Sequence, residues 1–254
     1  MTRLLDWLFT IPFLVTFGLL LAFFDPLQRL ARLFGQRPQE ITVGALQTGL
    51  VWAFRICGTR IEVERSPEVR PWSSYVLIAN HQSLFDVPIF GALLFSNFPK
   101  YVSKRELARW IPSISYNLRR GGNALIDRKD RAQALDEIRA LGRRLSERQV
   151  SAVIYPEGTR SRNGTLGPFR PGGSLELLEA APEVPVVPVT IDDSWTLLRH
   201  NLLPVPFGTR VRVRIGAPIA RAPNEDRAGL LARVREEIAG TLDGWRKADP
   251  RAAG

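Results

Sequence analysis

The chain has 254 residues, enough for one large or two small domains with a sizeable buried core. Lysine and arginine outnumber aspartate and glutamate by 35 to 25, and the net charge of +10 favours polyanionic partners: nucleic acid, an anionic membrane or phosphorylated substrates. The single cysteine, Cys57, excludes an intrachain disulfide, and one cysteine with two distant histidines argues against a zinc site of the usual spacing.

The first predicted element is apolar. Residues 7–24 contain no charged side chain, and their length is near the short limit for a helix that crosses a bilayer, about 20 residues. Pro12 and Gly18 interrupt this run, and we expect Asp25-Pro26 to end it. From residue 26 to 38, leucines recur at helical spacing between arginines, as in a helix that lies in a membrane interface.

Several interpretations of these residues stay open. A secretory signal peptide needs a small-residue cleavage site, and none precedes the arginine-rich stretch. A buried helix of a soluble protein needs a large protein around so apolar a run. A single crossing fits the length, but we favour a membrane-embedded helical hairpin that does not fully cross. Arginines are more numerous on the C-terminal side of the run, which predicts that the rest of the chain lies on the cytoplasmic face of the cell membrane.

From about Gly58 onward, short β-rich runs alternate with helical stretches. We expect helices at 87–95, 131–148 and 226–247, and strands at 74–79, 100–103, 124–127, 151–155, 184–191 and 211–215. Several of the runs are apolar throughout, as in strands covered on both faces. The pattern predicts an α/β fold with a mixed, mostly parallel sheet flanked by helices. We divide the chain into membrane-anchoring helices (1–57) and an α/β domain (58–254), and expect residues 249–254 to fray.

The segment NHQSLFD, residues 80–86, follows the first of these strands. Its histidine is expected in the turn at the strand's carboxyl end, where ligands bind in open α/β sheets. Residues five apart do not share a helix face, so His81 and Asp86 meet only if Asp86 lies at the start of the next helix, which Ser83 would cap. Asp86 would then fix the imidazole tautomer and leave the other nitrogen free to take a proton. In an alternative interpretation, Asp86 only caps the helix and His81 satisfies backbone groups.

A second strand end carries YPEGTRS, residues 155–161. Pro156 and Gly158 predict a turn from which Glu157, Thr159 and Arg160 project. A guanidinium beside a hydroxyl suits a phosphate. A solvated polar turn is the alternative.

Two further strand ends carry cations. Arg128 follows the strand at 124–127, and Lys104 follows the strand at 100–103. In the alternative interpretation, Lys104 is an ordinary exposed lysine. Arg128 then forms an ordinary surface pair with Asp127 that contributes little to stability. A His–Asp pair beside several cations indicates proton abstraction near a phosphate. No serine lies in a G-x-S-x-G setting and no glycine-rich Walker loop is present, so hydrolase and nucleotide-binding interpretations gain no support.

These motifs together resemble those of the glycerolipid acyltransferases, the superfamily of the 1-acyl-sn-glycerol-3-phosphate acyltransferases. NHQSLFD matches the family's NHxxxxD motif, and YPEGTRS resembles F-P-E-G-T-R-S, with Tyr155 in place of the usual Phe. GGNALIDR, VSKREL and VPVVPVTI resemble the I-D-R block, the lysine-bearing stretch and the fourth block. They occur in the family's order over about residues 75–191, and the N-terminal hairpin resembles that of bacterial members.

The resemblance implies an acyltransferase of phospholipid biosynthesis. It implies transfer of a fatty acyl group from acyl-CoA or acyl-carrier protein to 1-acyl-sn-glycerol-3-phosphate, giving phosphatidic acid. His81 would be the general base, oriented by Asp86, and no acyl-serine would form. The implied acceptor-binding residues are Glu157, Gly158, Thr159, Arg160, Arg128 and Lys104. The resemblance implies no metal and no cofactor. A membrane would supply the lyso-phospholipid acceptor.

The match departs from the family at residues 111–118, IPSISYNL, which lack the glycine-rich aromatic run common there. The acceptor could therefore be another lyso-lipid, such as a lyso-aminolipid. A different-class alternative is a non-catalytic basic protein that binds membranes or nucleic acid. Its basic residues, however, are spread over the chain rather than gathered with aromatics, so we expect no nucleic-acid partner. A hydrolase using the same pair with water is a third alternative.

Overall fold

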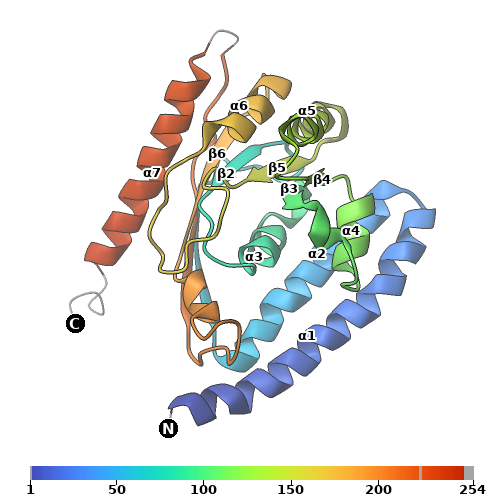
Figure 1. The fold of residues 1–254 in the computed structure, drawn as a ribbon, viewed down its shortest axis with the longest axis vertical. Helices are drawn as coiled ribbons and strands as arrows, with labels where there is room; N and C mark the ends of the chain where they lie inside the picture. The colour runs from blue at the N-terminus through green and yellow to red at the C-terminus, as the bar shows by residue number, and fades with distance from the viewer. Residues whose placement is uncertain (1, 223–224, 249–254) are drawn as a thin grey trace.

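The computed structural model describes residues 2–222 and 225–248, and the tail for which the sequence predicts fraying lies outside them. Its helices are α1 (Thr2–Leu33), α2 (Gln36–Ala53), α3 (Asp86–Leu93), α4 (Ile114–Arg120), α5 (Arg131–Arg148), α6 (Pro171–Ala180) and α7 (Arg227–Lys247). Its strands are β1 (Arg60–Arg65), β2 (Val76–Ala79), β3 (Pro99–Lys104), β4 (Ala124–Ile126), β5 (Ser151–Ile154), β6 (Val186–Asp192) and β7 (Arg210–Ile215). The predicted α/β alternation is confirmed (Figure 1).

The strands form one sheet in the order β1-β7-β6-β2-β5-β3-β4. Strands β6, β2, β5, β3 and β4 are parallel, whereas β7 is antiparallel to β6 and parallel to β1. The mixed, mostly parallel sheet is therefore as predicted. Because β2 lies at the centre, the segment that follows it has the carboxyl ends of β6 and β5 as neighbours.

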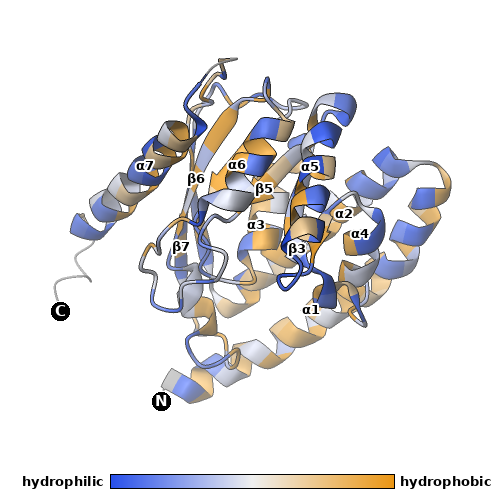
Figure 2. Ribbon diagram, turned by 45° about the horizontal axis from the view of Figure 1, so that its top comes forward, coloured by the Kyte–Doolittle hydropathy of each residue, from blue (hydrophilic) through white to orange (hydrophobic). Residues whose placement is uncertain are grey.

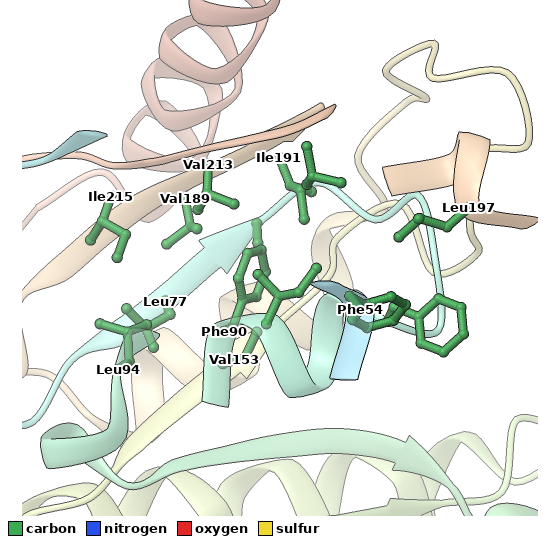
Figure 3. Packing of buried hydrophobic residues seen from close by; sticks show 14 of the residues in the cluster. Phe54, Leu77, Phe90, Leu94, Val153, Val189, Ile191, Leu197, Val213 and Ile215 are labelled. Atoms are coloured by element: carbon green, nitrogen blue, oxygen red, sulfur yellow. The ribbon is translucent and has the colours of Figure 1, made fainter. Parts of the chain in front are cut away.

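Helices cover both faces of the sheet, because successive strand residues point to opposite sides. On one face, Leu77 of β2 packs against α3, and Figure 3 shows it with Phe90 and Leu94. On the other face, Val76 and Ile78 share a core with α5, α6 and α7. Every residue of β2 is buried, which explains why its sequence carries no polar alternation.

The sequence prediction was wrong about where the first helix ends. α1 continues through Pro12 and Pro26 to Leu33. Contacts lie on both sides of Pro26: Arg29 pairs with the carboxylate of Asp25 at 2.8 Å, and the Ser113 hydroxyl donates to the carbonyl of Leu21 at 2.7 Å. The chain reverses at Gly35, whose φ of 119° favours glycine, and α2 then packs beside α1 (Figure 1).

α1 is compatible with membrane association. Within the described residues, Arg3–Leu33 is the one helix long and apolar enough to cross a membrane, and only 17% of its most apolar window is buried. A core helix of a soluble protein would be mostly buried. The division of the chain into helices (1–57) and an α/β domain (58–254) stays a prediction. In the structure, Phe13 of α1 and Phe54, which directly follows α2, lie in the same core as the strands.

Sequence reasoning missed β1, α4 and α6; it expected helices within residues 1–57, where α2 lies, but did not give the bounds of α2. β1 reads RIEVER and is exposed along most of its length, so it lacks the apolar signal of the other strands. It forms by pairing with β7 at the edge of the sheet. Ile61 and Val63 alternate with charged residues, a short strand pattern that the pairing with β7 completes.

A buried ion-pair network joins α2 to the sheet. Glu40 of α2 lies 2.9 Å from the ammonium of Lys100 in β3 and 3.1 Å from a guanidinium nitrogen of Arg37. Arg148, at the end of α5, lies 3.7 Å away. Burial lowers the pKa of Lys100 to about 8, and the Glu40 carboxylate offsets this only in part.

This network predicts a pH-dependent stability. Between pH 8 and about 10.5, Lys100 is neutral in the folded chain but still protonated in the unfolded chain. The unfolded state then binds more protons, so stability rises with pH over this window. Relative to Lys100→Met, the parent should gain up to about 3 kcal/mol in free energy of unfolding, measured in detergent. Lys129→Met, at an exposed site, is the control, and an equal pH dependence of both variants would contradict the prediction.

Candidate active site

The NHQSLFD segment starts where β2 ends. Asn80 joins this end to β6 through two hydrogen bonds: its amide donates to the carbonyl of Ile191 and its oxygen accepts from the Ile191 amide, both at 2.8 Å. This side chain therefore continues the β2–β6 pairing by one residue beyond the strand. His81 follows in the turn, at the carboxyl edge of the sheet, as predicted.

His81 and Asp86 meet across this turn. The Nδ1 of His81 lies 2.8 Å from Oδ2 of Asp86, and Asp86 is the first residue of α3. A carboxylate only accepts hydrogen bonds, so the neutral imidazole carries its proton on Nδ1 and leaves Nε2 with a free lone pair. The His81 side chain is 17% exposed, whereas Asp86 is fully buried. The geometry is that of a base with its orienting carboxylate.

Backbone and side-chain donors hold the Asp86 carboxylate. Its Oδ2 accepts from the backbone amides of Gln82 and Ser83 at 2.8 and 2.9 Å. Its Oδ1 accepts from the hydroxyl of Ser194 at 2.6 Å. These donors satisfy a buried charge, which would otherwise be costly. The predicted capping role of Ser83 is wrong: Phe85 is the N-cap residue, and the Ser83 hydroxyl instead accepts from the Phe85 amide at 3.1 Å.

Ser194 is a site residue that sequence reasoning missed. It begins a short 3-10 helix, Ser194–Leu198, that follows β6, and it is fully buried. β6 is next to β2 in the sheet, although 108 positions separate Ser194 from Asp86 in the chain. The only available signal was a polar residue after a buried strand, the same signal that marked the other strand ends.

Tyr155 covers one face of the imidazole. The two rings stack with centroids 4.0 Å apart and an interplanar angle of 17°. The Tyr155 hydroxyl is buried and has no hydrogen-bond partner among the described residues. Burial, followed by the negative charge of Asp86, raises the pKa of Tyr155 well above its usual value. The ring is therefore neutral and fixes the plane of His81 by packing.

The YPEGTRS loop is fastened to the backbone of His81. Glu157 is buried; its Oε1 accepts from the His81 amide at 2.8 Å, and its Oε2 accepts from the Gly167 amide at 2.7 Å. The Ser161 amide in turn donates to the His81 carbonyl at 2.7 Å. Gly158 has a φ of 68°, the left-handed region that glycine adopts without strain, which lets the loop turn back. Burial raises the pKa of Glu157, against the two amide bonds that lower it.

The predicted cations lie at the same edge of the sheet. Lys104 ends β3 and pairs in register with Ile126, two residues before Arg128. Thr159 and Arg160 follow β5, which lies between β2 and β3. The exposed side chains at this edge are those of Lys104, Arg128, Thr159 and Arg160. The carboxylate of Glu157, in contrast, accepts hydrogen bonds from backbone amides. The topology thus brings the predicted residues to one edge, with His81 at its centre. Among the described residues, no cluster of three or more His, Cys, Asp or Glu side chains could hold a metal ion.

Comparisons with known proteins agree with this architecture. Residues 60–192 match the Acyltransferase family. The 1-acyl-sn-glycerol-3-phosphate acyltransferase of Salmonella typhimurium is 32% identical over 146 residues, 58% of this chain and 58% of that protein. The human 1-acyl-sn-glycerol-3-phosphate acyltransferase alpha is 31% identical over 182 residues, 71% of this chain and 63% of its own length. The match therefore spans about three fifths of these curated relatives.

One solved structure covers nearly the whole chain. The 1-acyl-sn-glycerophosphate (LPA) acyltransferase, PlsC, from Thermotoga maritima aligns with a TM-score of 0.79. The alignment covers 98% of this chain and 99% of that chain at 22% sequence identity. At this identity the likeness establishes the fold, including the pairing of an N-terminal helical hairpin with the α/β sheet.

The Glu157 contacts predict that Glu157→Gln destabilises the protein. Each carboxylate oxygen accepts from a backbone amide, and the NH₂ of glutamine would face one of those amides as a second donor. Leaving a buried amide unsatisfied should cost about 1–3 kcal/mol, measured as the free energy of unfolding in detergent. Glu183→Gln, an exposed glutamate after α6, is the matched control. Equal stability of the two variants would remove the clamping role of Glu157.

Proposed function

The chain belongs to the acyltransferase family, and from this we propose that it transfers a fatty acyl group from an acyl thioester to the free hydroxyl of 1-acyl-sn-glycerol-3-phosphate, giving phosphatidic acid. The observation that carries the proposal is the His81–Asp86 pair at the carboxyl edge of the sheet. The relatives named for this reaction support the acceptor, and acyl-CoA and acyl-carrier protein both remain candidate donors.

The proposed chemistry starts at Nε2 of His81. With Nδ1 bonded to Asp86, Nε2 accepts the proton of the acceptor's hydroxyl group. The oxygen attacks the thioester carbonyl carbon as its proton leaves, and a C–O bond forms. The buried carboxylate of Asp86 stabilises the imidazolium that results. The tetrahedral intermediate then collapses, the C–S bond breaks, and the leaving thiolate takes the proton from Nε2. No acyl-enzyme forms and no metal or other cofactor enters these steps.

We assign the acceptor's phosphate to the exposed cations at the same edge. Arg160 and Thr159 stand on the loop that is hydrogen-bonded to His81, so a phosphate bound there would bring the nearby hydroxyl toward Nε2. Lys104 and Arg128, on the neighbouring strands β3 and β4, would add positive charge. Gly158 supplies the turn. We assign Glu157 a positioning role, because both of its oxygens bind backbone amides.

A membrane location fits this substrate. A one-chain phospholipid is held in a bilayer, and an enzyme with α1 in one leaflet would take it laterally while the charged site stays at the headgroup level. We place the α/β domain on the cytoplasmic side, from the arginine excess after the apolar run. A panel of lyso-lipids, including lyso-aminolipids, with one labelled donor would identify the acceptor, and fatty acid release without any acceptor would instead indicate a hydrolase.

The first prediction from this mechanism is that His81→Ala loses transfer activity. Removing a general base typically costs about 10²–10⁴-fold, so kcat of the detergent-solubilised enzyme should fall by at least about 100-fold. The chain offers a matched control in His200→Ala, since His200 is its other histidine and lies outside the site. Wild-type turnover in a folded His81→Ala variant would refute the role of His81.

The second prediction concerns Arg160. Arg160→Ala should raise the KM for the lyso-phospholipid by about tenfold while the KM for the donor changes little, because the guanidinium is assigned to the acceptor's phosphate. Arg162→Ala, an exposed arginine two residues later in the same loop, controls for the loss of one charge. Equal increases in both KM values, or equal effects of the two variants, would remove this assignment.

A further inference from the structure

An open surface pocket lies where the C-terminal half of α1 meets the segment around α4. It has a volume of about 580 Å³ and shares no lining residue with NHQSLFD or YPEGTRS. Its charged and aromatic lining residues are Asp25, Arg29, Arg109, Trp110, Tyr116 and Arg119. We propose that this α1–α4 pocket binds the phosphate headgroup of an anionic phospholipid from the membrane that α1 contacts.

The charges of the pocket favour an anion. Asp25 is already paired: it lies 2.8 Å from Nε of Arg29 and accepts from the Ser113 amide at 2.6 Å. The remaining two arginines, Arg109 and Arg119, leave the pocket with a net positive charge. Arg119 donates to the backbone carbonyl of Ala108, which orients its guanidinium without neutralising it. Arginine forks match a phosphate in geometry as well as in charge.

The rim of the pocket is apolar. Trp110 is 95% exposed and is held at φ 66°, a backbone conformation that non-glycine residues seldom adopt. Leu107 and Ile111 beside it are also exposed. An indole at full exposure is poorly suited to water but well suited to the membrane–water interface, where its ring packs among headgroups and its N–H finds a partner. The arginines of the pocket would then lie at the depth of lipid phosphates.

α1 also carries an exposed apolar side, away from the pocket, that suits acyl chains. Leu19, Phe23 and Leu30 are more than half exposed, and their spacing places them along one side of the helix. Ser113 fixes the pocket to this helix, since its hydroxyl bonds the Leu21 carbonyl. Figure 2 shows the apolar run of α1 in orange and hydrophilic turns in blue toward its C-terminal end. A phospholipid would satisfy both the arginines and the exposed apolar rim at Trp110, whereas a soluble phosphate would satisfy only the arginines.

The test measures lipid binding and does not depend on catalysis. Protein in a neutral detergent is titrated with phosphatidylglycerol or phosphatidylcholine, and bound lipid is counted by native mass spectrometry. The pocket variant is Arg109→Gln/Arg119→Gln. The control is Arg105→Gln/Arg120→Gln, which removes the same charge from the same two segments at exposed residues outside the pocket lining.

We expect the parent and the control to prefer phosphatidylglycerol, and the pocket variant to bind it about tenfold more weakly, which corresponds to about 1.4 kcal/mol. Equal losses in the two variants would overturn the pocket and leave only general electrostatic attraction. Equal binding of the two lipids by the parent would also overturn it. Displacement of phosphatidylglycerol by millimolar inorganic phosphate or CoA would reassign the pocket to a soluble phosphate.

The bond from Arg119 to Ala108 makes a second variant necessary, in case the double substitution unfolds α4. Arg109→Glu reverses one exposed charge and leaves that bond intact, and Arg105→Glu is its control. Thermal unfolding of each variant establishes that it is folded. If folded Arg109→Glu retained the lipid affinity of Arg105→Glu, the proposal would fail.

Discussion

The buried carboxylate of Asp86 is the group on which the rest of the site depends. It accepts hydrogen bonds from His81, from the amides of Gln82 and Ser83, and from Ser194. A fully buried charge persists only where donors surround it, and the donors here come from one turn and from the end of a neighbouring strand. The hydrogen bonds to the Asp86 carboxylate therefore fix the turn after β2 and the tautomer of His81. The bond from Ser194 also fixes the end of β6 beside them. The same contacts that stabilise the charge also orient the imidazole of His81.

A second set of contacts, centred on Glu157, fixes the opposite side of His81. Its carboxylate receives the His81 amide, and the Ser161 amide reaches the His81 carbonyl, so the loop after β5 forms a backbone frame for the histidine. Tyr155 closes the face of the ring. The hydrogen bonds of Glu157 and Ser161 thus hold the loop that carries Arg160 to the backbone of His81. In the mechanism we propose, this frame sets the distance between the acceptor's phosphate and the hydroxyl that loses its proton.

Sequence reasoning found the parts of the site that carry a local signal. Apolar strands followed by polar residues marked His81, Glu157, Lys104 and Arg128, and parallel topology explains why they share an edge. Ser194 was missed because its partner is 108 positions away and no local pattern records that pairing. Glu157 was found, but its contacts with backbone amides follow only from the folded loop. The end of α1 was misplaced because tertiary contacts with Ser113 outweigh the proline at residue 26.

The aromatic residues between α1 and the site would let α1, in the membrane location we propose, position the His81–Asp86 pair. Phe85, which immediately precedes Asp86, lies with its ring centroid 4.7 Å from that of Phe54 and 6.5 Å from that of Phe13 in α1. Phe13 and Phe54 are almost fully buried, so this packing is rigid rather than a surface contact. In the membrane location we propose, the height of α1 in the lipid layer would therefore be transmitted to the turn that holds His81. A phosphate bound at the far half of α1 would fix that height further, because it would hold the helix at the level of the headgroups.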